Sequence, residues 1–174
     1  MALSKSFDHV ADHHARILIL GSMPGIESLK QQQYYAHPRN QFWDFMQALF
    51  GIERNLDYAE RLLKLQQHHI ALWDVAHQCE RPGSLDNSIQ SESIIPNDFQ
   101  RFYQAHPDIQ AVFFNGQKAA QIYQKLVLPK LPTAMQTLPR HILPSTSPAH
   151  AVMHYDAKLK QWLKITETLA TVAA

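Results

Sequence analysis

Four short apolar runs, separated by segments with helical periodicity, constrain the fold more than any other feature of this chain. Each run is short for a helix and is bounded by polar or turn-forming residues, which is typical of a buried strand. Strands that alternate with helices favour a parallel sheet with helices on both faces. We therefore predict an α/β fold of three α/β/α layers around a four-stranded parallel sheet, with strands at residues 16–20, 69–73, 109–114 and 141–143.

The segments between these runs predict the helices. They cover residues 40–50, residues 56–67, a segment that begins at Asn97, a segment from Gly116 to about Val127, and residues 155–172. Asn55 is available to cap the second of these helices. Asn97, followed three residues later by Gln100, forms a capping-box pattern at the start of the third. Residues 78–96 are rich in polar and turn-forming residues and are predicted to form one long loop.

Length and composition suit one domain. The chain has 174 residues, of which 45% are hydrophobic and 18% charged, and no repeat or linker divides it, so we expect a single domain over residues 1–174. No apolar run is long enough to span a bilayer and residues 1–14 are too polar for a secretory signal, so a cytoplasmic location is expected. Cys79 is the only cysteine, which excludes an internal disulfide and a four-cysteine iron–sulfur cluster.

A polar or turn-forming segment follows each predicted strand. These segments are residues 21–25, Asp74, residues 115–116 and residues 145–150. In an open parallel sheet, ligands bind at the carboxyl ends of the strands, so we expect the four segments to converge on one edge. Asp74 and Asp86 are possible general bases there, and a structural role is the alternative for each.

Three strings of residues in these segments carry a resemblance to a known family. They are GSMPG at residues 21–25 with YAHPRNQFW at residues 35–43, FFNG at residues 113–116, and LPSTSPAH at residues 143–150. In this order they resemble the motif regions of the uracil-DNA glycosylase superfamily. The closest resemblance is to the hypoxanthine-DNA (deoxyinosine) glycosylase family, with the mismatch-specific uracil glycosylases as relatives. The likeness spans roughly residues 16–165 and implies a uracil-DNA glycosylase-like fold.

The resemblance implies a base excision repair enzyme. It would hydrolyse the N-glycosidic bond of deoxyinosine, release hypoxanthine and leave an abasic site. Such a reaction needs an extruded base, a positioned water and donors to the departing anionic base. No lysine occupies a motif position suited to Schiff-base chemistry, so a monofunctional glycosylase is expected. The expected partner is double-stranded DNA that contains a deaminated base, and the protein is expected to act as a monomer.

Asn40 is the expected catalytic residue. An amide is no Brønsted base near neutral pH, but its carbonyl oxygen orients a water, and the resemblance assigns this role to the Asn of the motif. The alternative is an N-cap, because Asn40 precedes a predicted helix. Tyr35 is expected to stack on the extruded base, and an ordinary core or surface tyrosine is its alternative.

The loop after the first strand departs from the wider superfamily. Met23 stands where typical uracil glycosylases have a water-activating Asp and the mismatch-specific ones an Asn. Either Asn40 has taken over this task or the activity is weak. Main-chain groups of Ser22 and Met23 are expected to contact the base or the water, unless the loop is a simple turn. Asn115 is expected to read the base edge, and a turn-forming Asn before Gly is the alternative.

The last motif region is expected to contact DNA. Ser145 and Ser147 are expected to bind phosphates, and His150 to stabilise the leaving base or contact the backbone, unless it is merely exposed. Lys158 belongs to a basic segment, residues 140–164, with four Lys or Arg against one acid. We expect Lys158 to bind DNA, and a solvated helix face is the alternative.

No metal and no cofactor is expected. The chain has eleven histidines, but no HExxH or Cys/His ligand spacing. It also lacks a P-loop, a GxGxxG string and a GxSxG elbow, which argues against a nucleotide hydrolase, a Rossmann dehydrogenase and a serine hydrolase. Two alternatives to a deoxyinosine glycosylase stay open: a mismatch-specific uracil-DNA glycosylase, and a catalytically silent module that binds DNA or a nucleobase.

Overall fold

The computed structural model describes residues 3–172 and confirms the predicted parallel sheet. Its strands run in the order β3, β2, β6, β7, and each neighbouring pair is parallel. The strands are β2 (Ile17–Gly21), β3 (Ile70–Asp74), β6 (Ala111–Asn115) and β7 (Arg140–Leu143). β2, β3 and β6 are buried along their whole length, as expected for strands covered on both faces, whereas β7 is an edge strand.

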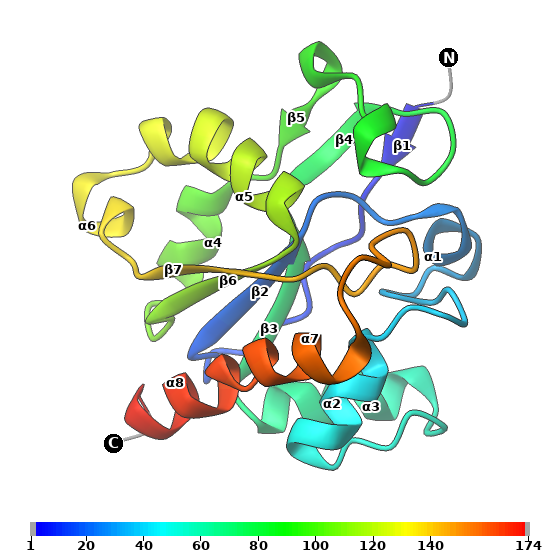
Figure 1. Cartoon of the computed structure of the whole chain (residues 1–174). Helices are drawn as coiled ribbons and strands as arrows, with labels where there is room; N and C mark the ends of the chain where they lie inside the picture. Colours follow the sequence, from blue (N-terminus) through cyan, green and yellow to red (C-terminus); the bar gives the residue numbers. More distant parts are fainter. Residues whose placement is uncertain (1–2, 173–174) are drawn as a thin grey trace.

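Helices cover both faces of this sheet, which confirms the predicted three layers (Figure 1). Successive side chains of a strand point to opposite faces, so Leu18 and Leu20 of β2 enter one core, and Ile17 and Ile19 enter the other. The first core is closed by α4 (Phe99–Ala105) and α5 (Gln117–Ile122). The second is closed by α2 (Phe42–Phe50), α3 (Tyr58–Gln67), α7 (Tyr155–Trp162) and α8 (Lys164–Val172).

The structure adds a second, antiparallel sheet that the sequence patterns do not predict. In it, β4 (Ala76–Glu80) pairs with β1 (Leu3–Lys5) and with β5 (Ile95–Pro96). The prediction that residues 78–96 form one long loop is therefore wrong at both ends. β1, one of the two partners of β4, lies far from it in the sequence, with Leu3 opposite Glu80, and no local pattern signals a pairing of that kind.

Two helix starts differ from the predicted caps. α3 begins after Asp57, not after Asn55. α4 is capped by Asp98, whose carboxylate accepts a backbone N–H of the first turn at 3.1 Å. The predicted cap Asn97 instead donates its side-chain amide to the main-chain oxygen at the end of β3, at 2.7 Å. A contact between distant segments has replaced the local one.

The remaining helical segments are more divided than predicted. Residues 155–172 form α7 and α8, and α5 continues into a π-helical turn at Tyr123–Val127. The short helices α1 (Ile26–Gln31) and α6 (Thr133–Gln136) are additional. Within residues 3–172, no helix is both long enough and apolar enough to cross a bilayer. Residues 1–2 and 173–174 of the predicted domain lie outside the described residues, and the first two of them begin the polar segment 1–14.

Candidate active site

The carboxyl ends of the four parallel strands open into one cleft, as the sequence predicts. Its volume is about 810 Å³, and its lining comes from the ends of β2, β3, β6 and β7 and from the segments before α2 and after β4. The predicted site residues that line it are Ser22, Met23, Tyr35, Asn40, Asn115, Ser145, Ser147 and His150. Among residues 3–172, no group of three His, Cys, Asp or Glu side chains is arranged to hold a metal ion.

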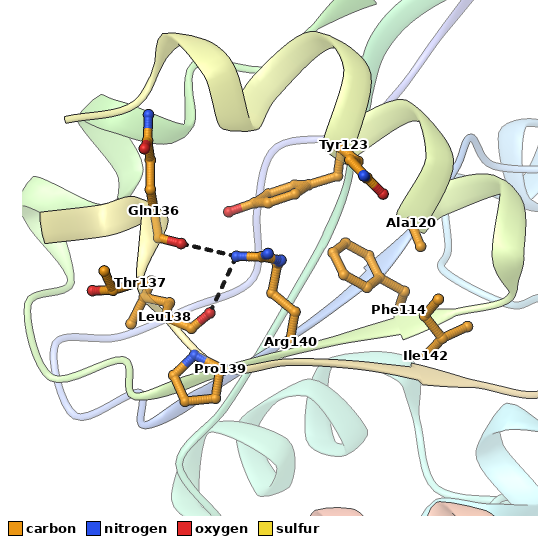
Figure 2. A pocket seen from close by; sticks show the side chains of 10 residues that line it. Phe114, Ala120, Tyr123, Gln136, Thr137, Leu138, Pro139, Arg140 and Ile142 are labelled. Atoms are coloured by element: carbon orange, nitrogen blue, oxygen red, sulfur yellow. Dashed lines mark hydrogen bonds between the residues drawn. The ribbon is translucent and has the colours of Figure 1, made fainter. Parts of the chain in front are cut away.

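A smaller pocket of about 400 Å³ lies between β7, α5 and α6 (Figure 2). Within it, Nη1 of Arg140 donates to the main-chain oxygens of Gln136 and Leu138, at 2.9 and 3.5 Å. This pocket shares only Ile142 with the cleft, and none of the predicted site residues lines it. The chemistry that the motifs suggest therefore belongs to the larger cleft.

Three side chains from the segment after β4 hold the loop after β2. Asp86 accepts the hydroxyl proton of Ser22 at 2.6 Å, and the hydroxyl of Ser84 accepts the first backbone N–H of α1 at 2.7 Å. The buried guanidinium of Arg81 donates to the main-chain oxygen of Pro24. Sequence reasoning sees residues 81–84 only as a turn, because these partners are far apart in the chain. Together the three contacts fix the shape of the loop on one wall of the cleft.

Met23 uses its side chain for packing. It is 6% exposed and lies in a small apolar cluster with Ala76, Cys79 and Ile89. A thioether in this cluster takes no part in activating water. Any polar contact that this position makes to a base or a water therefore comes from its main chain.

Tyr35 presents a supported aromatic ring to the cleft. The ring stacks on Phe42, with 4.2 Å between centroids and 25° between planes. Its φ of 56° lies in the left-handed region, which is strained for a residue with a side chain and is held by the surrounding packing. The hydroxyl is buried without a hydrogen-bond partner among residues 3–172. Burial, and then the charge of Asp74, raise the pKa of Tyr35, so its hydroxyl stays protonated.

Asn40 lies at the cleft, one residue before Gln41, which is the N-cap of α2, so the alternative prediction of Asn40 as the N-cap is one residue early. Its Oδ1 accepts the N–H of Phe42 at 3.0 Å, and the side chain is buried. An amide oxygen has two lone pairs, so one acceptor position remains for a water. The main chain is held as well: Arg54 donates to the Asn40 oxygen at 3.1 Å, and the Gln41 N–H donates to the Thr146 oxygen at 3.0 Å. These bonds keep the amide in one place, which a water-orienting group requires.

Asn115 joins the end of β6 to the loop of residues 145–150. Its Nδ2 donates to the hydroxyl of Thr146 and its Oδ1 accepts the Thr146 N–H, both at 2.9 Å. The next residue, Gly116, has a φ of 96°, and a Cβ there would lie 3.2 Å from the Cβ of Ser145. Strand end and loop thus pack at a distance that favours glycine. That Asn115 reads a base edge stays a prediction. It would use the amide hydrogen and the oxygen lone pair that the bonds to Thr146 leave free.

Lys158 lies beneath this loop and not on the surface. Its ammonium donates to the main-chain oxygens of Ser145 and His150, each at 2.7 Å, and the residue is 2% exposed. Burial lowers the pKa of its ammonium. The prediction that Lys158 binds DNA does not agree with this placement, because its donors are turned to the loop backbone. Ser145 and Ser147 are half-buried at the cleft, and His150 is exposed.

β3 ends inside the cleft with a buried carboxyl. Asp74 is 2% exposed, and its Oδ2 accepts the hydroxyl proton of Ser6 at 2.8 Å. Burial raises the pKa of Asp74 from 3.8 to about 7; the Ser6 bond and Arg81 oppose this rise, and Asp86 adds to it. The sequence marks Asp74 through its place at a strand end, but only the fold shows that the carboxyl titrates near neutral pH.

Known proteins are similar to this chain in sequence and in architecture. The family model of the uracil DNA glycosylase superfamily matches residues 7–170. Proteins named hypoxanthine DNA glycosylase from Methanosarcina barkeri and Methanosarcina acetivorans are each 37% identical, over 67% and 72% of this chain and 73% and 78% of their own lengths. A solution NMR structure of a candidate uracil DNA glycosylase from Methanosarcina acetivorans matches with a TM-score of 0.79 and 32% identity, over 97% of this chain and 99% of that one. The chain therefore belongs to the uracil DNA glycosylase superfamily.

Proposed function

We propose that this chain is a DNA glycosylase that hydrolyses the N-glycosidic bond of deoxyinosine, releases hypoxanthine and leaves an abasic site. The cleft carries the proposal, because it places the supported ring of Tyr35 and the fixed amide of Asn40 at the same edge of the sheet. The two Methanosarcina relatives named for hypoxanthine support the choice of base.

The geometry supports a division of tasks among the lining residues. A base within a duplex reaches a cleft of this kind only after extrusion, and the outer face of the Tyr35 ring then stacks on it. The free acceptor position of Asn40 orients a water toward C1′ of the sugar. Because glycosidic bond breaking runs ahead of attack, orientation suffices where no strong base is present. Main-chain groups of Ser22 and Met23 contact the base or the water.

The substrate is double-stranded DNA with a deaminated base, and the protein acts on it as a monomer. Ser145, Ser147 and His150 lie at the cleft on a loop whose backbone is held from beneath, so they are presented to phosphates and to the departing base. The same segment continues to Val152, which is 92% exposed. An exposed apolar side chain beside a base-accepting cleft suits contact with unstacked bases.

Base release from matched duplexes tests the proposal. The duplexes carry one deoxyinosine, one deoxyuridine or neither, and free base is measured under single turnover. Asn40→Ala is expected to slow hypoxanthine release by about 100-fold or more. Asn40→Ser keeps a side-chain oxygen able to accept the N–H of Phe42 but places it closer to the main chain, away from the water. It therefore separates support of the helix start from water orientation, and its hypoxanthine release is expected to be slow as well. Asn55→Ala, at an exposed position, is the matched control.

The same measurement weighs the alternatives. The NMR structure described as a candidate uracil DNA glycosylase favours uracil as the second candidate base, and faster release from the deoxyuridine duplex would replace hypoxanthine in the proposal. Tight binding to the deoxyinosine duplex without any release would indicate a catalytically silent module. If the Asn40→Ser variant released hypoxanthine as fast as the wild type, Asn40 would not be the residue that orients the water.

A further inference from the structure

The carboxyl at the end of β3 has no task in the mechanism above, although it lines the cleft. Asp74 is 2% exposed, and a carboxyl is seldom buried to that extent unless it is paired or protonated. We propose that Asp74 is a catalytic residue that holds a proton and delivers it to a ring nitrogen of the departing purine. This inference rests on the proposed function.

The two carboxylate oxygens of Asp74 have different surroundings. Oδ2 accepts the hydroxyl proton of Ser6 at 2.8 Å, which fixes the orientation of the group. Oδ1 faces Gly21, where an added Cβ would lie 2.6 Å from Oδ1 and 3.2 Å from the hydroxyl oxygen of Tyr35. Glycine at the end of β2 therefore lets both groups approach the same point. Oδ1 therefore lies on the same side of Gly21 as the hydroxyl of Tyr35, the residue on which the extruded base is proposed to stack.

Several titratable groups face Asp74 from the elements packed around it. Tyr34 and Tyr35 precede α2, Tyr58 comes from α3, and Arg81 and Asp86 come from the segment after β4. The pKa of each of the three tyrosines is raised, chiefly by burial, so they stay neutral. The charge of Arg81 favours the carboxylate and that of Asp86 opposes it.

Burial outweighs these charges and raises the pKa of Asp74 to about 7. Protonated and ionised forms then coexist near neutral pH, which is the condition under which a general acid is most effective. Asn40 and Tyr35, which also line the cleft, are poorer proton donors than Asp74. The amide of Asn40 has no acidic proton, and the hydroxyl of Tyr35 has a raised pKa.

The proposed step balances as follows. The Asp74 proton moves to N7 of the purine, and the C1′–N9 bond breaks with its electron pair moving to N9, so neutral hypoxanthine leaves. The water held by Asn40 forms a bond to C1′ and releases one proton to solvent through the open cleft. Asp74, now a carboxylate, takes a proton from solvent and is ready for another turnover. No oxidant, reductant or further reactant is needed.

A pH profile of single-turnover hypoxanthine release tests this role. Wild type, Asp74→Asn and the exposed control Asp108→Asn are compared from pH 5 to pH 9 on a duplex with one deoxyinosine. The wild-type rate and that of the control are expected to fall by about tenfold for each pH unit above 7, as Asp74 loses its proton. Asp74→Asn is expected to be about 100-fold slower at pH 6 and independent of pH. Its affinity for the same duplex is expected to match the wild type.

Ser6→Ala provides a second test in which the carboxyl remains. The Ser6 bond lowers the pKa of Asp74, so its loss is expected to move the falling limb of the profile to higher pH. A purely structural Asp74 would leave that limb in place. The inference is overturned if Asp74→Asn keeps the wild-type profile or if Ser6→Ala does not shift it. Absence of release by the wild type at every pH would instead overturn the proposed function, and this inference with it.

Discussion

Replacement of Asp74 by Asn is expected to stabilise the fold at neutral and alkaline pH. The pKa of Asp74 is about 7 in the folded protein and is taken as its ordinary value, 3.8, in the unfolded chain. Folding therefore favours the protonated form, and the stability associated with this proton is complete below pH 3.8 and is lost as pH rises to 7. At 1.36 kcal/mol for each pH unit, the difference amounts to about 4 kcal/mol above pH 7. Asn carries no charge and is not subject to this loss.

Urea unfolding followed by tryptophan fluorescence measures this effect, because Trp43, Trp73 and Trp162 are buried. Wild type and Asp74→Asn are expected to have similar free energies of unfolding at pH 4. At pH 8 the variant is expected to be more stable by about 4 kcal/mol. The exposed control Asp108→Asn should follow the wild type throughout. A difference between Asp74→Asn and wild type that does not change with pH would refute the assignment of a raised pKa.

Two further substitutions test how the loop of residues 145–150 is held. Lys158→Met removes a buried ammonium that donates to two main-chain oxygens. We expect the variant to lose about 2–3 kcal/mol of unfolding free energy and to bind duplex DNA more weakly. The control Lys160→Met, at an exposed position, should change stability little. Equal effects of the two lysine substitutions would contradict this. Gly116→Ala forces an alanine into a backbone conformation with positive φ and brings its Cβ to 3.2 Å from the Cβ of Ser145. Gly51→Ala forces the same kind of backbone conformation but makes no close contact. In thermal unfolding, Gly116→Ala is therefore expected to lower the melting temperature more than Gly51→Ala, and a reversed order would show that the loop yields easily.

The sequence by itself determined the central architecture and the place of the site. Short apolar strands and the turn residues after them are local features, and they predict the parallel sheet and the convergence of residues 21–25, Asp74, residues 115–116 and residues 145–150 at one cleft. The motif strings predict the family for the same reason, because each lies within a few neighbouring residues. The local pattern also places Asn40 at the start of a helix, and in the structure its Oδ1 accepts the N–H of Phe42, the first residue of α2, although the N-cap is Gln41.

Only the tertiary structure decided how each polar side chain is used. Lys158 looks like a surface cation in the sequence, but packing of α7 under the loop buries it. β4 pairs with β1 as well as with β5, and β1 lies far from it in the sequence. Arg81 donates to the main-chain oxygen of Pro24, which is also distant in the chain. Asp74 acquires a near-neutral pKa only because distant segments exclude water from it. Burial and long-range pairing depend on residues far apart in the chain, so these roles arise from the fold and not from local sequence.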